Sequence, residues 1–277
     1  MLKLIYIVCL TLVVTSCSGP QDNANTTATT TVTPPPTQKL SLVPRPEKII
    51  DERGQRGEQD EAKPVLKILS PVQGASQDGN TVAVRLSLSG DLKGYKPEKD
   101  PGTGMGNHIH VILDDNPYEA YYDLSQPFEF KDLTPGKHVL RVFASRPWHE
   151  SYKNESAFQM VTFTVKGPEQ SSCDVDPAKP LLTYSRPKGE YQGIDADPIM
   201  IDFWLSNAKL KGDGGQYLVR YIIDDDEPRI IDKWEPIWLS GWKPGKHTVR
   251  LELLGADQYP LKNGSFNITT RDISVVK

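Results

Sequence analysis

Two copies of one short pattern decide the fold: Leu133–Val142 reads LTPGKHVLRV, and Trp242–Leu251 reads WKPGKHTVRL. In each copy a Pro-Gly pair, typical of a tight turn, is followed by a histidine that begins an alternating series of apolar residues. Such alternation predicts a strand with one buried face. The turn prolines, Pro135 and Pro244, lie 109 positions apart. A turn and strand repeated at this distance predict two copies of one module.

The neighbouring strands repeat in the same phase, and two of the three do so at nearly the same interval as the turns. The matched segments are 82–88 with 199–205, 109–113 with 219–223, and 128–130 with 237–239. No stretch of ten residues has convincing helical periodicity. Short strands separated by turn signals favour an all-β fold built from two tandem β-sandwiches.

The repeated turn resembles a feature of fibronectin type III and related immunoglobulin-like domains. In those domains an apolar residue two positions before Pro-Gly tucks under the turn, and Leu133 and Trp242 occupy that position here. The repeat places two sandwiches at 65–167 and 178–277, joined by a linker at 168–177, and the resemblance implies that they are immunoglobulin-like. It implies no particular ligand, because sandwiches of this class host many functions.

The N-terminal residues are typical of an exported protein. Residues 1–16 combine a basic start, an apolar run too short to span a membrane and small residues, which predicts a signal peptide. The segment Val14–Cys17 resembles the bacterial lipobox, in which the cysteine is acylated. That resemblance implies a palmitate-type anchor on Cys17 and a location in the cell envelope. Ser18 favours the outer membrane if the cell has two membranes.

Residues 17–64 are rich in Thr, Pro, Asn and charge, with few apolar residues to offset the entropy of ordering. We therefore expect a disordered tether between the anchor and the first sandwich. Cys173 is then the single cysteine of the folded part, so no internal disulfide is expected. Its position in a linker-like stretch favours a solvated bystander over a reactive thiol.

Charge and motifs exclude several classes of function. The formal net charge is −4 with no basic patch, so we expect no nucleic-acid partner. The chain lacks the sequence patterns of serine hydrolases, phosphate-binding loops, zinc proteases and dinucleotide-binding domains. We predict that it is not an enzyme and has a non-catalytic binding role with an envelope protein or glycan partner.

His108 and His110 form a candidate metal site. They alternate with the apolar Ile109 and Val111 and so share the outward face of their strand, where two imidazoles bind Cu(II) or Zn(II) readily. The second domain lacks the pair, so the scaffold does not require it. The alternative is a pair of solvated histidines. The residues that are candidates to complete the site are Met105, Asp114, Asp115 and His149.

The loop at 145–158 is a candidate recognition surface. Its binding candidates are Arg146, Trp148, His149, Glu150 and Tyr152, because loops carry binding residues and Trp, Tyr and Arg anchor interfaces. The alternative is that Trp148 folds back over the open end of the sandwich as a hydrophobic plug.

Two further groups of residues stand out in the sequence. The repeated His138 and His247 are expected to be packed, structural histidines. Domain two also carries four tryptophans, which would bind a glycan if exposed but are favoured to pack in the core or between the domains; they are Trp204, Trp234, Trp238 and Trp242.

Overall fold

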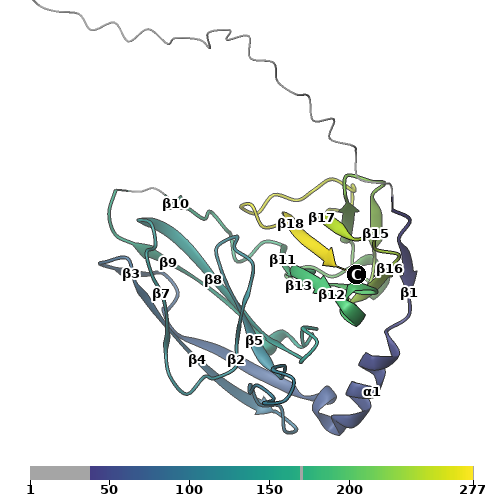
Figure 1. Ribbon diagram of the computed structural model, residues 1–277. Coiled ribbons are helices and arrows are strands. Elements are labelled where there is room, and N and C mark those ends of the chain that lie inside the picture. The colour runs from purple at the N-terminus through teal and green to yellow at the C-terminus, as the bar shows by residue number, and fades with distance from the viewer. Residues whose placement is uncertain (1–37, 169–170, 277) are drawn as a thin grey trace, which may run out of the picture. The chain divides into compact units, whose positions relative to one another are not determined.

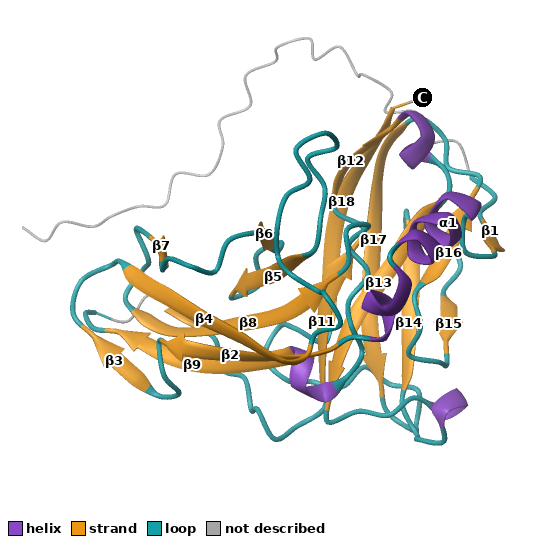
Figure 2. Ribbon diagram, turned by 90° about the horizontal axis from the view of Figure 1, so that it is seen from below, coloured by secondary structure: helices purple, strands orange, loops and turns teal. Residues whose placement is uncertain are grey.

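The computed structural model describes residues 38–168 and 171–276, and the strands of these residues form two tandem β-sandwiches (Figures 1 and 2). The predicted all-β class and tandem arrangement are therefore confirmed. The predicted signal peptide and Cys17 lie outside the described residues. No helix in the described part of the chain is both long and apolar enough to cross a membrane.

The first sandwich packs a three-stranded sheet against a larger one. The smaller sheet has the order β2-β4-β7, with β2 at Lys63–Ser70, β4 at Val82–Asp91 and β7 at Phe128–Phe130. The larger has the order β3-β9-β8-β5-β6, and β10 (Ser171–Ser172) pairs with β8. Its strands are β3 (Ala75–Gln77), β5 (His108–Leu113), β6 (Glu119–Tyr121), β8 (Gly136–Ser145) and β9 (Phe158–Val165), the last preceded by the short helix η2 (Glu155–Ala157).

The second sandwich repeats this plan. One sheet has the order β1-β16-β13-β11 and the other β12-β18-β17-β14-β15. The strands are β1 (Ser41–Val43), β11 (Leu181–Arg186), β12 (Gly189–Gln192), β13 (Ile199–Ser206), β14 (Leu218–Ile223), β15 (Arg229–Ile231), β16 (Ile237–Ser240), β17 (Gly245–Leu254) and β18 (Ile268–Val276), with the short helices η3 (Gly193–Ala196) and η4 (Lys211–Asp213) between them. In both sandwiches a short strand pairs in parallel with the last long strand: β3 with β9 and β12 with β18.

The repeated histidines pin the same turn in both domains. His138 Nδ1 lies 2.7 Å from a carboxylate oxygen of Asp114, and His247 Nδ1 lies 2.7 Å from Asp224. The other ring nitrogen faces a backbone carbonyl at 2.8 Å in each case. Both nitrogens of each ring therefore face oxygen acceptors, which fixes the orientation of the ring. The prediction that these histidines are structural agrees with this geometry.

The backbone of the pinned turns is equally alike. Asp114 and Asp224 both have φ of +53°, a left-handed conformation that Asp tolerates better than most residues. The second carboxylate oxygen of each accepts the amide of the residue after the histidine, at 2.9 and 2.8 Å. Gly136 and Gly245 have φ of +136° and +138°, where a side chain would be strained. The repeated sequences Pro-Gly-Lys-His and Asp-Asp therefore form the same pair of hydrogen-bonded turns in both sandwiches.

Each sandwich has its own apolar core. Alternate residues of β4 and β14 point inward, as the sequence predicts. Trp242 is 1% exposed under its turn, and its Nε1 donates to the carbonyl of Leu239 at 2.7 Å. Leu133, at the matching position, is half-buried against the first core.

The two sandwiches bury a second face of their strands against each other. Every residue of β5 is buried, including His108 and His110, which alternate with the core residues Ile109 and Val111. Arg141 of β8 is buried, and its guanidinium lies 4.1 Å from the ring centroid of Phe266 and donates to Thr183 Oγ1 at 3.1 Å. Burial lowers the pKa of Arg141 to about 10. The outward face of this sheet is thus an interior surface.

The predicted tether is wrong for residues 38–64, which are ordered (Figure 1). Strand β1 pairs antiparallel with β16 of the second sandwich, helix α1 (Glu47–Gln55) and the short helix η1 (Gly57–Glu61) follow, and β2 then enters the first sandwich. We call residues 38–64 the N-terminal strap. Its composition is polar, but a vacant sheet edge supplies backbone hydrogen bonds that composition does not register. Leu40 and Ala62 are also buried in the two cores.

Cys173 is not the solvated residue that the sequence favours. It is half-buried beside Val139, Leu181 and Phe266, and its thiol donates to Asp114 at 3.2 Å. Burial, with the charge of Asp114 and the bond to it, raises the pKa of the thiol to about 12. A thiol that stays protonated at neutral pH is a poor nucleophile.

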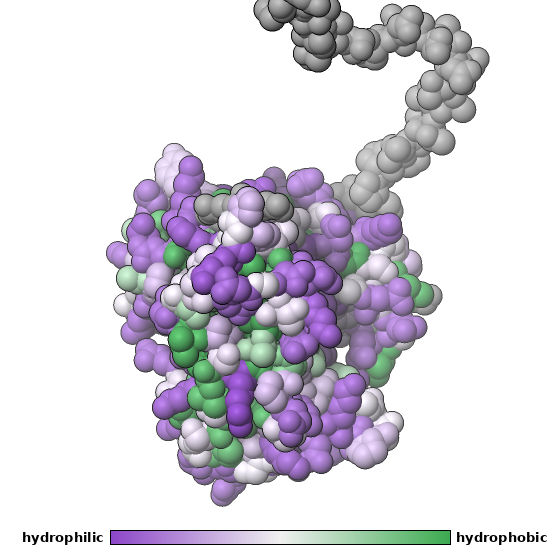
Figure 3. All heavy atoms as spheres, turned by 90° about the vertical axis from the view of Figure 1, so that its left-hand side faces the viewer, coloured by the Kyte–Doolittle hydropathy of each residue, from purple (hydrophilic) through white to green (hydrophobic). Residues whose placement is uncertain are grey.

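The surface is mixed in character. On the face drawn in Figure 3, hydrophilic residues surround a limited number of hydrophobic ones. Single exposed apolar side chains of this kind, such as Val72 at 60% and Ile194 at 74% exposure, are normal for a folded protein.

Replacing Asp114 by Ala should lower the free energy of unfolding by about 2–4 kcal/mol, because the bonds from His138, Val139 and Cys173 are lost and Ala is strained at positive φ. Urea unfolding measures this difference. Asp114→Asn, which keeps an acceptor for the Val139 amide and tolerates the backbone angle, should lose much less. Equal stability of Asp114→Ala and the wild type would show that the His-Asp contact does not hold the turn.

Candidate metal centre

Three histidines converge beside the sandwich interface. His108 and His110 come from β5 and are both 0% exposed, in contrast to the alternative of solvated strand histidines. His149 comes from the turn that follows β8, in which its amide donates to the carbonyl of Arg146 at 2.9 Å. It has φ of +68°, a left-handed angle at which His is enriched among non-glycine residues. We call His108, His110 and His149 the histidine triad.

The ring nitrogens of the triad face one another. His108 Nε2 lies 2.9 Å from His110 Nε2 and 2.9 Å from His149 Nδ1. One nitrogen from each ring lies within 4.8 Å of the others, a grouping that suits a metal ion. His108 Nδ1 lies 2.7 Å from the carbonyl of Gly106, which only accepts, so Nδ1 carries the proton and Nε2 keeps its lone pair.

Burial keeps the triad uncharged at neutral pH. It lowers the pKa of His108 to about 4, against a smaller opposing effect of the Gly106 carbonyl. Burial likewise holds the pKa of His110 well below its usual value, with further lowering by its two histidine partners, Arg186 and Lys188. The pKa of His149 is lowered by burial first and then by the charge of Arg186. Neutral imidazoles are the form that binds metals.

Aromatic rings and the second sandwich surround the triad. The ring of Tyr118 stacks on His110 with centroids 3.5 Å apart, and Tyr122 lies 5.1 Å from His108. Phe143 meets His110 edge-on at 4.9 Å. Ser185 of β11 places its hydroxyl 3.3 Å from His110 Nδ1. Phe143 lies opposite His110 on the paired strand β8, whereas Ser185 reaches the triad only through the packing of β5 against the second sandwich, which nothing in the sequence marks.

The donor set fits a transition metal. Three nitrogens bound at 2.0–2.1 Å from one ion are about 3.3–3.6 Å apart, so the rings need to separate only slightly. In metal sites the second nitrogen of a ligating histidine usually bonds to a carbonyl or another polar group, and His108 and His110 have such partners in Gly106 and Ser185.

Only one of the additional candidate ligands joins the pair. His149 completes the triad, whereas Asp114 is bound to His138 and Asp115 to Arg271 at 3.0 Å. Met105 is 38% exposed in the loop that precedes β5. The sequence pattern therefore indicated the first two histidines directly, and His149 as one of several possibilities.

The loop at 145–158 is not an exposed recognition surface, which corrects that prediction. Trp148, Arg146, Glu150 and Tyr152 are only 2–9% exposed. The indole of Trp148 packs against Met200 and Trp238 of the second sandwich and against Val43 and Ile49 of the N-terminal strap. The alternative, in which Trp148 is a hydrophobic plug, agrees better with this burial. Trp148 does not cover the open end of one sandwich, however, but packs where the first sandwich, the second sandwich and the N-terminal strap meet.

Charged partners fix the remaining residues of that loop. Glu150 accepts from the indole Nε1 of Trp148 at 2.8 Å and forms an ion pair with Arg45. Burial raises the pKa of Glu150, but Arg45 and Arg146 outweigh it and hold the pKa below its usual value. Arg146 donates to Asp60 at 2.6 Å. The loop therefore binds the N-terminal strap. The sequence did not indicate this contact, because the composition of the strap predicts disorder.

The tryptophans of the second domain are packed, as favoured. Trp204, Trp238 and Trp242 are at most 6% exposed, and Trp234 is partly buried. Trp204 lies parallel to Phe158 of the first sandwich, with centroids 5.3 Å apart. An exposed aromatic row for sugar stacking is therefore not formed by these residues.

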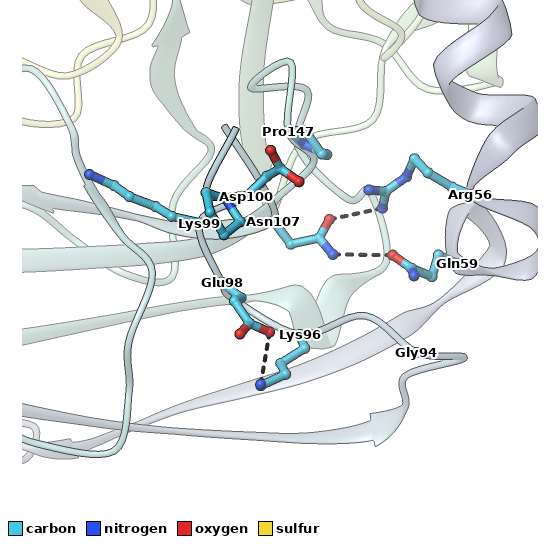
Figure 4. Close-up of a pocket in the computed structure, with 11 residues that line it drawn as sticks. Arg56, Gln59, Gly94, Lys96, Glu98, Lys99, Asp100, Asn107 and Pro147 are labelled. Carbon is cyan, nitrogen blue, oxygen red and sulfur yellow. Dashed lines mark hydrogen bonds and ion pairs between the residues drawn. The ribbon is translucent and has the colours of Figure 1, made fainter. Parts of the chain in front are cut away.

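A polar pocket of about 390 Å³ lies beside the strand end that carries the triad (Figure 4). Figure 4 shows Asn107 at its centre, bonded to Arg56 at 2.8 Å and to Gln59 at 3.2 Å. The lining residues Asn107 and Pro147 each lie one or two positions before a triad histidine. The strap thus supports the backbone segments that position the site.

Comparisons with known proteins give no family for this chain: no family model and no curated protein matches. Among solved structures, it is similar to the fibronectin(III)-like modules of Clostridium thermocellum CbhA, with 12% identity, a TM-score of 0.28, and coverage of 76% of this chain and 94% of that one.

Two other similarities are of the same kind. The central fibronectin-III array of RIM-binding protein has 11% identity and a TM-score of 0.26, over 79% of this chain and 70% of that one. A Bacteroides ovatus protein, SGBP-B, solved with a mixed-linkage heptasaccharide, has 10% identity and a TM-score of 0.22, over 76% and 47%. None of these similarities assigns a ligand to this chain.

Trp148→Ala should lower the free energy of unfolding by about 3–5 kcal/mol, as expected for removal of a buried aromatic side chain. Chemical denaturation followed by circular dichroism measures the change. Trp148→Phe keeps most of the packing but lacks the indole donor to Glu150, and should cost less. Wild-type stability of Trp148→Ala would mean that the indole does not hold the junction together.

Proposed function

We propose that this protein binds a copper or zinc ion through His108, His110 and His149. The observation that carries the proposal is the convergence of three uncharged imidazole nitrogens within 4.8 Å in the protein interior. Buried polar groups that face one another without a structural need call for an explanation. The second sandwich has Leu218 and Arg220 at the matching strand positions, so the fold forms without the pair.

The role proposed for the site is binding without catalysis. The chain has no recognised catalytic sequence motif, and its charged turn residues serve the fold, as Asp114 and Asp224 do. The metal would supply Lewis acidity and three strong bonds to nitrogen. The chain's own part is to hold the three rings in place, exclude water from β5 and fix the tautomer of His108 through Gly106.

Titration of the purified chain with Zn(II) or Cu(II), followed by calorimetry, should give one ion per chain. Each of the single variants His108→Asn, His110→Asn and His149→Asn should weaken binding by more than about 100-fold, since even a residue that only supports a ligand contributes 10–100-fold. Ser185→Ala is the matched control, because Ser185 lies beside His110 without being a ligand. Its metal affinity should be only about 10-fold lower than that of the wild type. Binding that survives in all three histidine variants would sink the proposal.

We also propose that the chain is held in the cell envelope by a lipid on Cys17. The lipobox-like sequence Val14–Cys17 supports this proposal, and it lies outside the described residues. An anchored site would meet metal ions from outside the cytoplasm.

Metabolic labelling with a fatty-acid analogue should mark the wild type but not Cys17→Ala, because the thiol is the acylated group. In cell fractionation, the variant should then appear in the soluble fraction, whereas the wild type should appear in the membrane fraction. Cys173→Ala is the matched control and should label normally. Equal labelling of Cys17→Ala would exclude this anchor.

A further inference from the structure

Two cationic side chains of the second sandwich lie next to the histidine triad. The Lys188 ammonium lies 4.4 Å from the ring centroid of Tyr118, the ring that stacks on His110. The Arg186 guanidinium lies 6.0 Å from the same centroid and 5.3 Å from that of Tyr191. Both charges act on the triad, since they help to lower the pKa values of His110 and His149.

Within the part of the chain that the structure describes, no direct ion pair neutralises these cations. Among the described residues, neither Arg186 nor Lys188 has a carboxylate within ion-pair distance; their hydrogen bonds go to the carbonyls of Lys188 and Tyr118. The carboxylates whose charge acts on them are Asp202, which binds Lys153 at 2.7 Å, and the exposed Glu119. The triad itself contains no carboxylate or thiolate. An ion bound there adds its full charge to a positive environment.

The surroundings of the triad also restrict the number of ligands. Tyr118, Tyr122 and Phe143 pack against the imidazoles, and His108 and His110 have no solvent exposure. Zinc sites are almost always four-coordinate, with a fourth protein ligand or a water. Monovalent copper is stable with three nitrogen donors and requires no fourth.

We infer that the histidine triad selects monovalent copper, Cu(I), over the divalent ions Zn(II) and Cu(II). The inference rests on the metal-binding function proposed above and specifies the ion. Electrostatic repulsion from Arg186 and Lys188 is proportional to the charge of the bound ion, so it penalises a divalent ion twice as much as a monovalent one. The closed, three-nitrogen shell acts in the same direction.

The test compares affinities for Cu(I) and Zn(II) in the whole chain and in Arg186→Met. Cu(I) affinity is measured anaerobically with ascorbate and a competing Cu(I) chelator, and Zn(II) affinity with a competing zinc chelator. Removing the charge should tighten Cu(I) binding about 10-fold and Zn(II) binding about 100-fold, because the logarithm of the gain scales with ion charge. X-ray absorption of the Cu(I) form should show three nitrogen ligands.

Two variants control for the loss of packing. Arg186→Lys keeps the charge and should leave the ratio of the two affinities within about threefold of the wild type. Lys188→Met removes the other charge from a half-buried position and should shift the ratio in the same direction as Arg186→Met. Circular dichroism and the melting temperature establish that each variant is folded.

Equal gains for the two ions in Arg186→Met, or tighter binding of Zn(II) than of Cu(I) by the wild type, would overturn the inference while leaving metal binding intact. A loss of Zn(II) affinity in Arg186→Met would also overturn it, since the arginine would then hold an anion on the metal. Failure of the wild type to bind any of the three ions would instead sink the proposed function, and the inference with it.

Discussion

The burial of the outer face of β5 and β8 against the second sandwich is the constraint on which the rest of the structure depends. In a single immunoglobulin-like sandwich this face meets water, and polar residues there need no partner. Here it is covered, so the polar residues on it need partners within the protein. Arg141 donates to Thr183 and to the carbonyl of Asp114 and lies against Phe266, although its Nε has no hydrogen-bond partner among the described residues. His110 faces Ser185 and the other two histidines of the triad.

The same constraint gives the histidines their chemistry. A pair of imidazoles at positions i and i+2 of an exposed strand would be partly protonated near neutral pH and free to move. Covering them removes water, which keeps the rings neutral, and fixes their orientation through Gly106 and Ser185. The second sandwich therefore contributes to the candidate site mainly through its cover and its two cations, while all three nitrogens of the triad come from the first.

The fold could be predicted from the sequence because its information is local and repeated. The PGKH turns, the alternating apolar residues and the matching DD turns all act within a few positions of one another. The candidate site could be predicted only in part. His108 and His110 are adjacent on one strand, but Arg186 and Lys188 reach the triad through packing between domains, which no periodicity encodes. The predicted disorder of the strap was wrong for the same reason, because the strap is ordered by pairing with the edge of β16, some 200 residues away.

The path of the N-terminal strap has a mechanical consequence. The chain enters the described region at β1, whose three residues pair with β16, and only afterwards reaches α1, η1 and the first sandwich. A pulling force applied from the side of residue 38 is thus borne first by residues 38–43, where Gln38 donates to Asp224, Leu40 lies in the second core and β1 pairs with β16. Release of this segment from the second sandwich would relieve tension at small extension, before the load reaches α1 and the first sandwich.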